Sequence, residues 1–79
     1  MDAIKFTIKE AAQQKALDLS KEHKSIFYVI YCHKTEAWYV DDNPFIRLFG
    51  ELVTTYENGK EIPNETTGTY TDSMESAVE

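Results

Sequence analysis

The sequence predicts an α+β fold in which one main helix packs on an antiparallel sheet of four to five strands. Three observations support it: an alanine-rich stretch before residue 24, a run of β-branched and aromatic residues over 26–31, and turn signals between short apolar segments further on. The expected order is strand, helix, strand, strand, short helix, strand, strand. With 79 residues, the chain has the size of one small domain.

Composition divides the chain into a body and a tail. Residues 1–62 are expected to form the α+β domain, whereas residues 63–79 are expected to be disordered because Thr, Ser, Gly and acids dominate them. The tail has no Lys or Arg, and its acids are Glu65, Asp72, Glu75 and Glu79. It therefore carries −4 of the formal charge of −6 and leaves −2 on the body. This balance would repel a phosphate backbone, so nucleic acid is not an expected partner.

The first two elements follow from periodicity. Ile4 and Phe6 alternate with polar residues, which predicts a short strand. Thr7 and Glu10 have the spacing of a capping box, which predicts a helix that continues to about His23. One side of this helix is made of Ile8, Ala11, Ala12, Ala16, Leu19 and His23. The alanines would let the helix lie close to a sheet.

The middle of the chain predicts a β-hairpin. Residues 25–33 are almost entirely β-branched or aromatic, the polar residues 34–36 follow, and the apolar residues 37–40 return as a second strand.

The last elements depend on turn chemistry. Asn43 before Pro44 predicts the start of a short helix over 45–49, closed by Gly50. The alternative is one long strand over 45–57 with a bulge at Gly50, and we favour the short helix. Residues 51–57 then form a strand.

Asn58-Gly59 predicts a type I′ hairpin turn. The strand over 60–62 that follows this turn ends at Pro63.

The central strand is apolar on both faces. Ile26, Ile30 and Cys32 alternate with Phe27, Val29 and Tyr31, and a sheet with one wet face would instead alternate apolar with polar residues. We expect the helix to cover the side that carries Ile26 and Ile30. The Phe27 side then needs another cover, which the segment 45–49, a second copy of the chain or another protein would provide.

A homodimer is the leading functional hypothesis, because two-fold pairing is the commonest assembly of small proteins. The protein would be a non-enzymatic protein–protein interaction module. Its expected interface residues are Phe27, Val29, Tyr31, His33, Trp38 and Tyr39. The alternative is a small-molecule-binding protein, or an accessory or regulatory subunit, with a pocket between the aromatic sheet face and residues 45–49.

Catalytic, cofactor and metal sites are not expected. Cys32 and His33 are neighbours in a strand, so they point to opposite faces and cannot act as nucleophile and base. Together with His23 they match no zinc spacing. Asp41 and Asp42 are too few carboxylates for a calcium loop.

The expected location is the cytoplasm of a bacterium, without contact with a membrane. The N-terminus lacks the pattern of a signal peptide, and the longest apolar run, over 26–32, is too short to span a bilayer. The single cysteine excludes a disulfide within the chain. In length and in the run Ser25-Ile26-Phe27-Tyr28-Val29-Ile30-Tyr31, the chain resembles short uncharacterised single-domain proteins of gut Bacteroidetes, a resemblance that implies no function.

Overall fold

The computed structural model describes residues 2–63, so the tail expected from residue 63 lies, apart from Pro63, outside the described residues. The elements follow the predicted order: β1 (Ile4–Phe6), α1 (Lys9–His23), β2 (Ile26–Cys32), β3 (Ala37–Asp41), the 3₁₀ helix η1 (Pro44–Phe49), β4 (Glu51–Glu57) and β5 (Lys60–Ile62).

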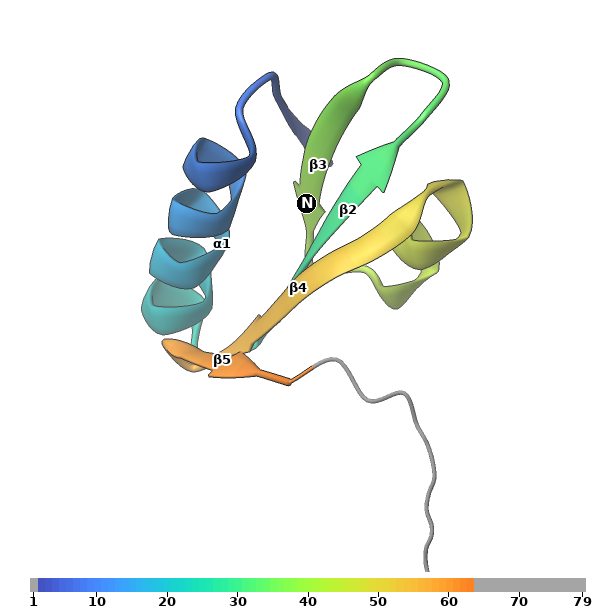
Figure 1. Cartoon of the computed structure of the whole chain (residues 1–79). Coiled ribbons are helices and arrows are strands. Elements are labelled where there is room, and N and C mark those ends of the chain that lie inside the picture. The colour runs from blue at the N-terminus through green and yellow to red at the C-terminus, as the bar shows by residue number, and fades with distance from the viewer. Residues whose placement is uncertain (1, 64–79) are drawn as a thin grey trace, which may run out of the picture.

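One antiparallel sheet contains all the strands, in the order β1-β3-β2-β4-β5. The helix α1 lies along one face of this sheet, and the short η1 lies on the other side (Figure 1). The α+β prediction is confirmed, with five strands and one main helix.

The helix begins one residue later than the capping box requires. Ile8 is the N-cap, in an extended conformation, and no side chain caps the helix. Thr7 therefore lies outside the helix, and the capping-box prediction is wrong. At the other end, Lys24 adopts the left-handed conformation with φ 52°, and its backbone N–H donates to the carbonyl of Ser20.

The core lies between α1 and the sheet. From the helix it takes the small side chains of Ala12 and Ala16 together with Leu19. From the sheet it takes Phe27, Val29, Val40 and Tyr56. Small residues on the helix allow the close approach, and the larger residues of the sheet fill the space between the layers.

Strand register explains why these residues meet. Val29 of the central strand is paired with Val40 on one side and with Thr54 on the other, so the three side chains point to the same face. That face is the one under α1, where Gln13 Nε2 donates a hydrogen bond of 2.7 Å to Thr54 Oγ1. The side chains of Ile30 and of its cross-strand partners Tyr39 and Leu52 point to the opposite face.

The turns before and after β4 each contain a glycine, for different reasons. Asn58 and Gly59 have φ angles of 51° and 80°, as a type I′ turn demands, and this confirms the predicted hairpin. Gly50 joins η1 to β4 in an extended conformation, and a Cβ atom there would overlap the carbonyl oxygen of Tyr31. The short helix that we favoured over one long strand is confirmed by η1. The register shift between β2 and β4 lies between Val29 and Ile30, not at Gly50.

Candidate functional site

The short helix η1 is built as its sequence predicts. The side chain of Asn43 accepts a hydrogen bond of 3.0 Å from the backbone N–H of Phe45, and Pro44 occupies the first turn. A 3₁₀ helix repeats every three residues, so Ile46 and Phe49 share one side while Phe45 and Leu48 share another. Ile46 is buried against the sheet. The side with Phe45 and Leu48 has no such cover from residues 2–63.

Three large apolar side chains of η1 are exposed and form what we call the η1 apolar surface. The exposed fractions are 68% for Phe45, 78% for Leu48 and 68% for Phe49. Arg47 lies at its side, with the guanidinium carbon 5.2 Å from the centre of the Tyr28 ring. Exposed large apolar side chains gathered on one short helix are more typical of an interaction site than of a monomer's ordinary exterior.

A pocket of about 270 Å³ lies between η1 and the sheet. We call it the Ile30 pocket. Its lining is almost entirely apolar and consists of Ala3, Ile30, Cys32, Tyr39, Ile46 and Phe49. The lining therefore joins the start of the chain, the two central strands and η1.

Hydrogen-bonding groups meet at one edge of the Ile30 pocket. The hydroxyl oxygens of Thr35 and Tyr39 are 3.0 Å apart. Hydrogen bonds from the Thr35 side chain and backbone hold the pKa of the Cys32 thiol below its usual value, and the backbone and charge of Lys34 act in the same direction. Burial raises the pKa of the thiol with a smaller effect than either Thr35 hydrogen bond and a larger one than either Lys34 contribution. This edge of the pocket consequently favours negative charge.

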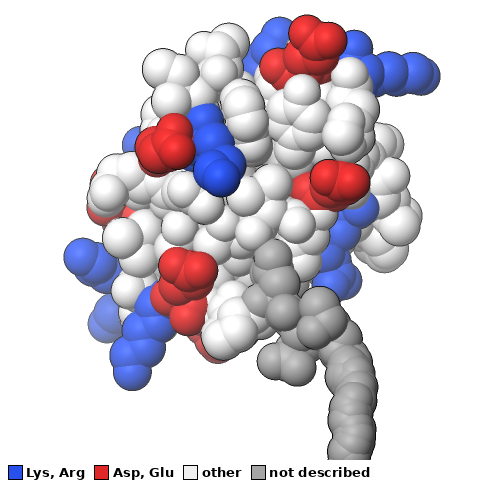
Figure 2. All heavy atoms as spheres, viewed as in Figure 1, with Lys and Arg blue, Asp and Glu red and all other residues white. Residues whose placement is uncertain are grey.

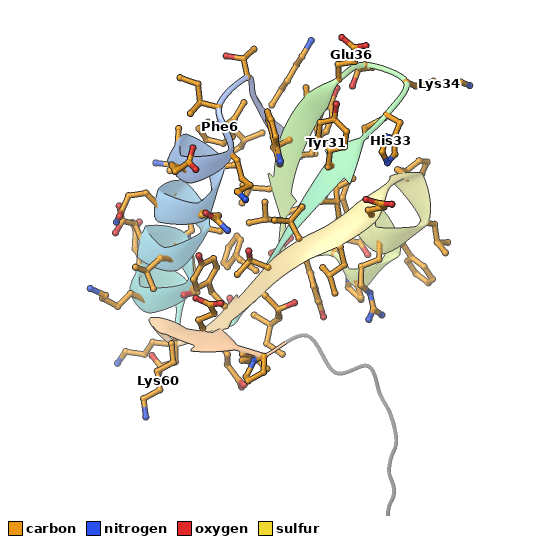
Figure 3. The ribbon with its side chains drawn as sticks, viewed as in Figure 1. Phe6, Tyr31, His33, Lys34, Glu36 and Lys60 are labelled. Carbon is orange, nitrogen blue, oxygen red and sulfur yellow. The ribbon has the colours of Figure 1, made fainter. Side chains whose placement is uncertain are left out.

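Charged side chains surround this part of the molecule without forming a patch of one sign. Lys34 and Glu36 project together from the turn between β2 and β3 (Figure 3). Lys5 is the cross-strand partner of Tyr39 and shares its face of the sheet. On the face shown in Figure 2, acidic and basic side chains are interspersed.

The predicted interface residues do not share one open face. Phe27 and Val29 are 1% and 0% exposed under α1, so the prediction that they await a partner is wrong. The helix covers the face opposite to the one we expected. Tyr39 lies on the other face, where it lines the Ile30 pocket.

The remaining predicted residues do come together. Tyr31 forms ring contacts with His33 at 4.8 Å and with Trp38 at 4.9 Å between centroids. His33 Nε2 is also 3.4 Å from a carboxylate oxygen of Glu51. Tyr31 and His33 project from the end of β2 near the turn (Figure 3). Tyr31 and Trp38 are half-buried, and both belong to the α1 side of the sheet.

Within residues 2–63, no group of three or more His, Cys, Asp and Glu side chains could hold a metal ion. No helix of this described region is long and apolar enough to cross a membrane.

Comparison of the chain with protein-family models, with curated proteins and with solved structures found no match.

The apolar segment 45–49 was predicted from the sequence, but the exposure of its side chains was not. It expected Phe45, Leu48 and Phe49 to help cover the sheet, whereas Ile46 is the side chain that is buried there. The three-residue repeat of a short 3₁₀ helix was the available signal, because such a helix turns only one of its sides toward a sheet.

Proposed function

We propose that this protein is a non-enzymatic interaction module that associates with a second copy of itself through the η1 apolar surface. The observation that carries the proposal is the exposure of three large apolar side chains, Phe45, Leu48 and Phe49, on one short helix. Full burial of one such side chain contributes about 1.5–3 kcal/mol, so covering all three would be a substantial gain for a domain of this size.

The chemistry of the surface suits pairing with itself. Its centre is apolar, and Arg47 is drawn to the side by Tyr28. A two-fold axis through such a centre brings apolar groups together and does not force like charges into contact. Another protein could use the same surface, and the solution mass of the isolated chain separates the two cases.

The size of the interface indicates what else it would include. A standard interface covers about 800 Å² on each partner, roughly one sixth of the 4830 Å² surface of this molecule. Three side chains do not supply that area. The contact would therefore extend from η1 onto neighbouring residues such as Leu52, which is partly exposed on the same face as Ile30.

Sedimentation equilibrium from about 5 to 500 µM tests the proposal. The expected result is a mass that rises toward twice 9.1 kDa as the concentration increases. Leu48→Ser should keep the protein at the monomer mass.

The matched control is Ile8→Ser, which alters another exposed large side chain at the start of α1. This variant should associate as the wild type does. A monomer mass for the wild type at every concentration would refute the proposal, and so would equal association of the Leu48 variant.

A further inference from the structure

The Ile30 pocket is open to solvent on one side. Its 270 Å³ corresponds to about nine volumes of water or methylene groups and lies just below the range of about 300–1,000 Å³ that is usual for small-molecule sites. Apolar walls hold water poorly, so filling this space with hydrocarbon would be favourable. The pocket therefore suits a short apolar body such as a branched or straight chain of about eight carbons or a single aromatic ring.

The polar groups at the pocket indicate which headgroup fits. The Thr35 hydroxyl is 3.0 Å from that of Tyr39 in the turn that follows Cys32, and hydrogen bonding by Thr35 is the main cause that lowers the pKa of the Cys32 thiol. The ammonium group of Lys34 also favours a negative charge there. Hydrogen bonding of this kind stabilises an anion.

A second lysine lies beside the same pocket. Lys5 pairs with Tyr39 across the strands, so the two side chains leave the sheet on the same face about 5 Å apart at Cβ. Asp41, which also belongs to this face, is buried and accepts a hydrogen bond of 3.2 Å from the backbone N–H of Asn43. Lys5 therefore supplies an exposed positive charge on this face of the sheet, whereas Lys34 shares its turn with the acidic Glu36.

From these observations we infer that the Ile30 pocket binds a small carboxylic acid, with the apolar body between β2, β3 and η1 and the carboxylate near Lys5 and Lys34. The pocket shares Phe49 with the η1 apolar surface, but Leu48 does not line it. A substitution of Leu48 therefore tests self-association without altering the pocket lining.

The single cysteine provides the readout, because Cys32 lines the pocket. The rate at which iodoacetamide alkylates Cys32 is measured in the full-length protein at increasing concentrations of octanoate. The expected result is a saturable decrease of at least several-fold, while the alkylation of a free low-molecular-weight thiol is unchanged. Octanol should protect more weakly, and octylamine least.

Two pairs of variants locate the effect. Ala3→Phe places a ring in the pocket and should abolish the effect of octanoate, whereas Ala11→Phe, on the exposed side of α1, should not. Lys5→Glu should weaken protection by about three- to tenfold, and Lys15→Glu, with the same change of charge on α1, by less than about twofold.

Leu48→Ser should leave octanoate protection intact even where it abolishes self-association. The inference is wrong if octanoate does not slow alkylation, or if octylamine protects as well as octanoate. A third outcome would also show the inference to be wrong. In it, the alkylation rate falls as the protein concentration rises, and octanoate causes no further decrease in the wild type or in the Leu48 variant. A second copy of the chain would then occupy the pocket.

Discussion

The hydroxyl of Ser20 accepts a hydrogen bond of 2.9 Å from the backbone N–H of Gly59, 39 residues further along the chain. The same hydroxyl donates to the carbonyl of Leu17 at 2.8 Å. Ser20 is fully buried, so no water replaces either partner. This side chain joins the last turn of α1 to the β4–β5 turn and completes the hydrogen bonding of both.

Replacing Ser20 with alanine should lower the free energy of unfolding by about 1–3 kcal/mol, because the N–H of Gly59 would lose its acceptor in a partly buried turn. Urea denaturation measures this change. Gln14→Ala is the control, since it removes an exposed hydrogen bond to Asp18 and should change stability by less than about 0.5 kcal/mol. Equal stability of the Ser20 variant and the wild type would contradict the assigned role.

Replacing Gly50 with alanine should destabilise the fold by about 1–3 kcal/mol or more, because the new methyl group overlaps the Tyr31 carbonyl. The pairing of Tyr31 with Glu51 should also be disturbed, which cross-strand NMR contacts would reveal. Gly59→Ala serves as the comparison. It strains a positive φ and crowds the Lys21 side chain, yet it should leave the Tyr31–Glu51 contacts in place.

Phe27 and Phe45 should respond very differently to truncation. Phe27→Ala removes a ring that is 1% exposed in the core and should cost about 3–5 kcal/mol. Phe45→Ala alters an exposed ring and should cost less than about 0.5 kcal/mol in dilute protein, where the chain is monomeric. Similar losses for the two variants, measured by denaturant unfolding, would contradict the assignment of the two faces.

The alkylation of Cys32 should have a shifted pH profile. The Thr35 hydrogen bonds favour the thiolate in the folded state, so the rate should reach half its maximum at a lower pH than in urea-unfolded protein. Thr35→Val should move the midpoint upward. Because the pKa of Cys32 is lower in the folded state than in the unfolded state, its thiolate stabilises the fold. This stabilisation is fully present above the unfolded pKa and is lost as the pH falls through the folded pKa.

A midpoint for folded Cys32 at or above that of the unfolded chain would contradict the role of Thr35. Thr55→Val is a suitable control for the threonine substitution, because Thr55 is the cross-strand neighbour of Tyr28 and not of Cys32.

Local chemistry was the part of the fold that the sequence predicted well. The Asn58-Gly59 turn and the Asn43-Pro44 helix start each depend on a few adjacent side chains, and both are found. The capping-box prediction was wrong because the helix begins one residue later than Thr7 requires. Ile8 is the N-cap, so Glu10 is the second residue of the helix rather than the third and cannot reach back to the N-cap backbone.

The face covered by α1 was not predictable in the same way. Both β1 and β2 are antiparallel to β3, so they are parallel to each other, and α1 is the crossover between them. Crossovers of this type are nearly always right-handed, so the strand order determines which face the helix covers. That order is a property of the whole chain. Without it, the Phe27 and Ile30 sides could not be distinguished by their apolar character alone.

The same reason limited prediction of the candidate site. The segment around residue 45 was correctly expected to lie near the sheet, but the Ile30 pocket also requires Ala3 and Tyr39, which come from separate parts of the chain. Their meeting depends on β1 and β3 being neighbours.

The two layers on the sheet are held with very different strengths, and this has a dynamic consequence. α1 contributes four buried residues, whereas η1 contributes Ile46 alone. Detaching η1 would expose Ile46 and also Ile30, which is 0% exposed beneath it, a loss of about 3–6 kcal/mol that lies at the lower end of the stability typical of a whole domain. Sub-global opening should therefore begin at η1, and its amide protons should exchange with solvent long before those of β2.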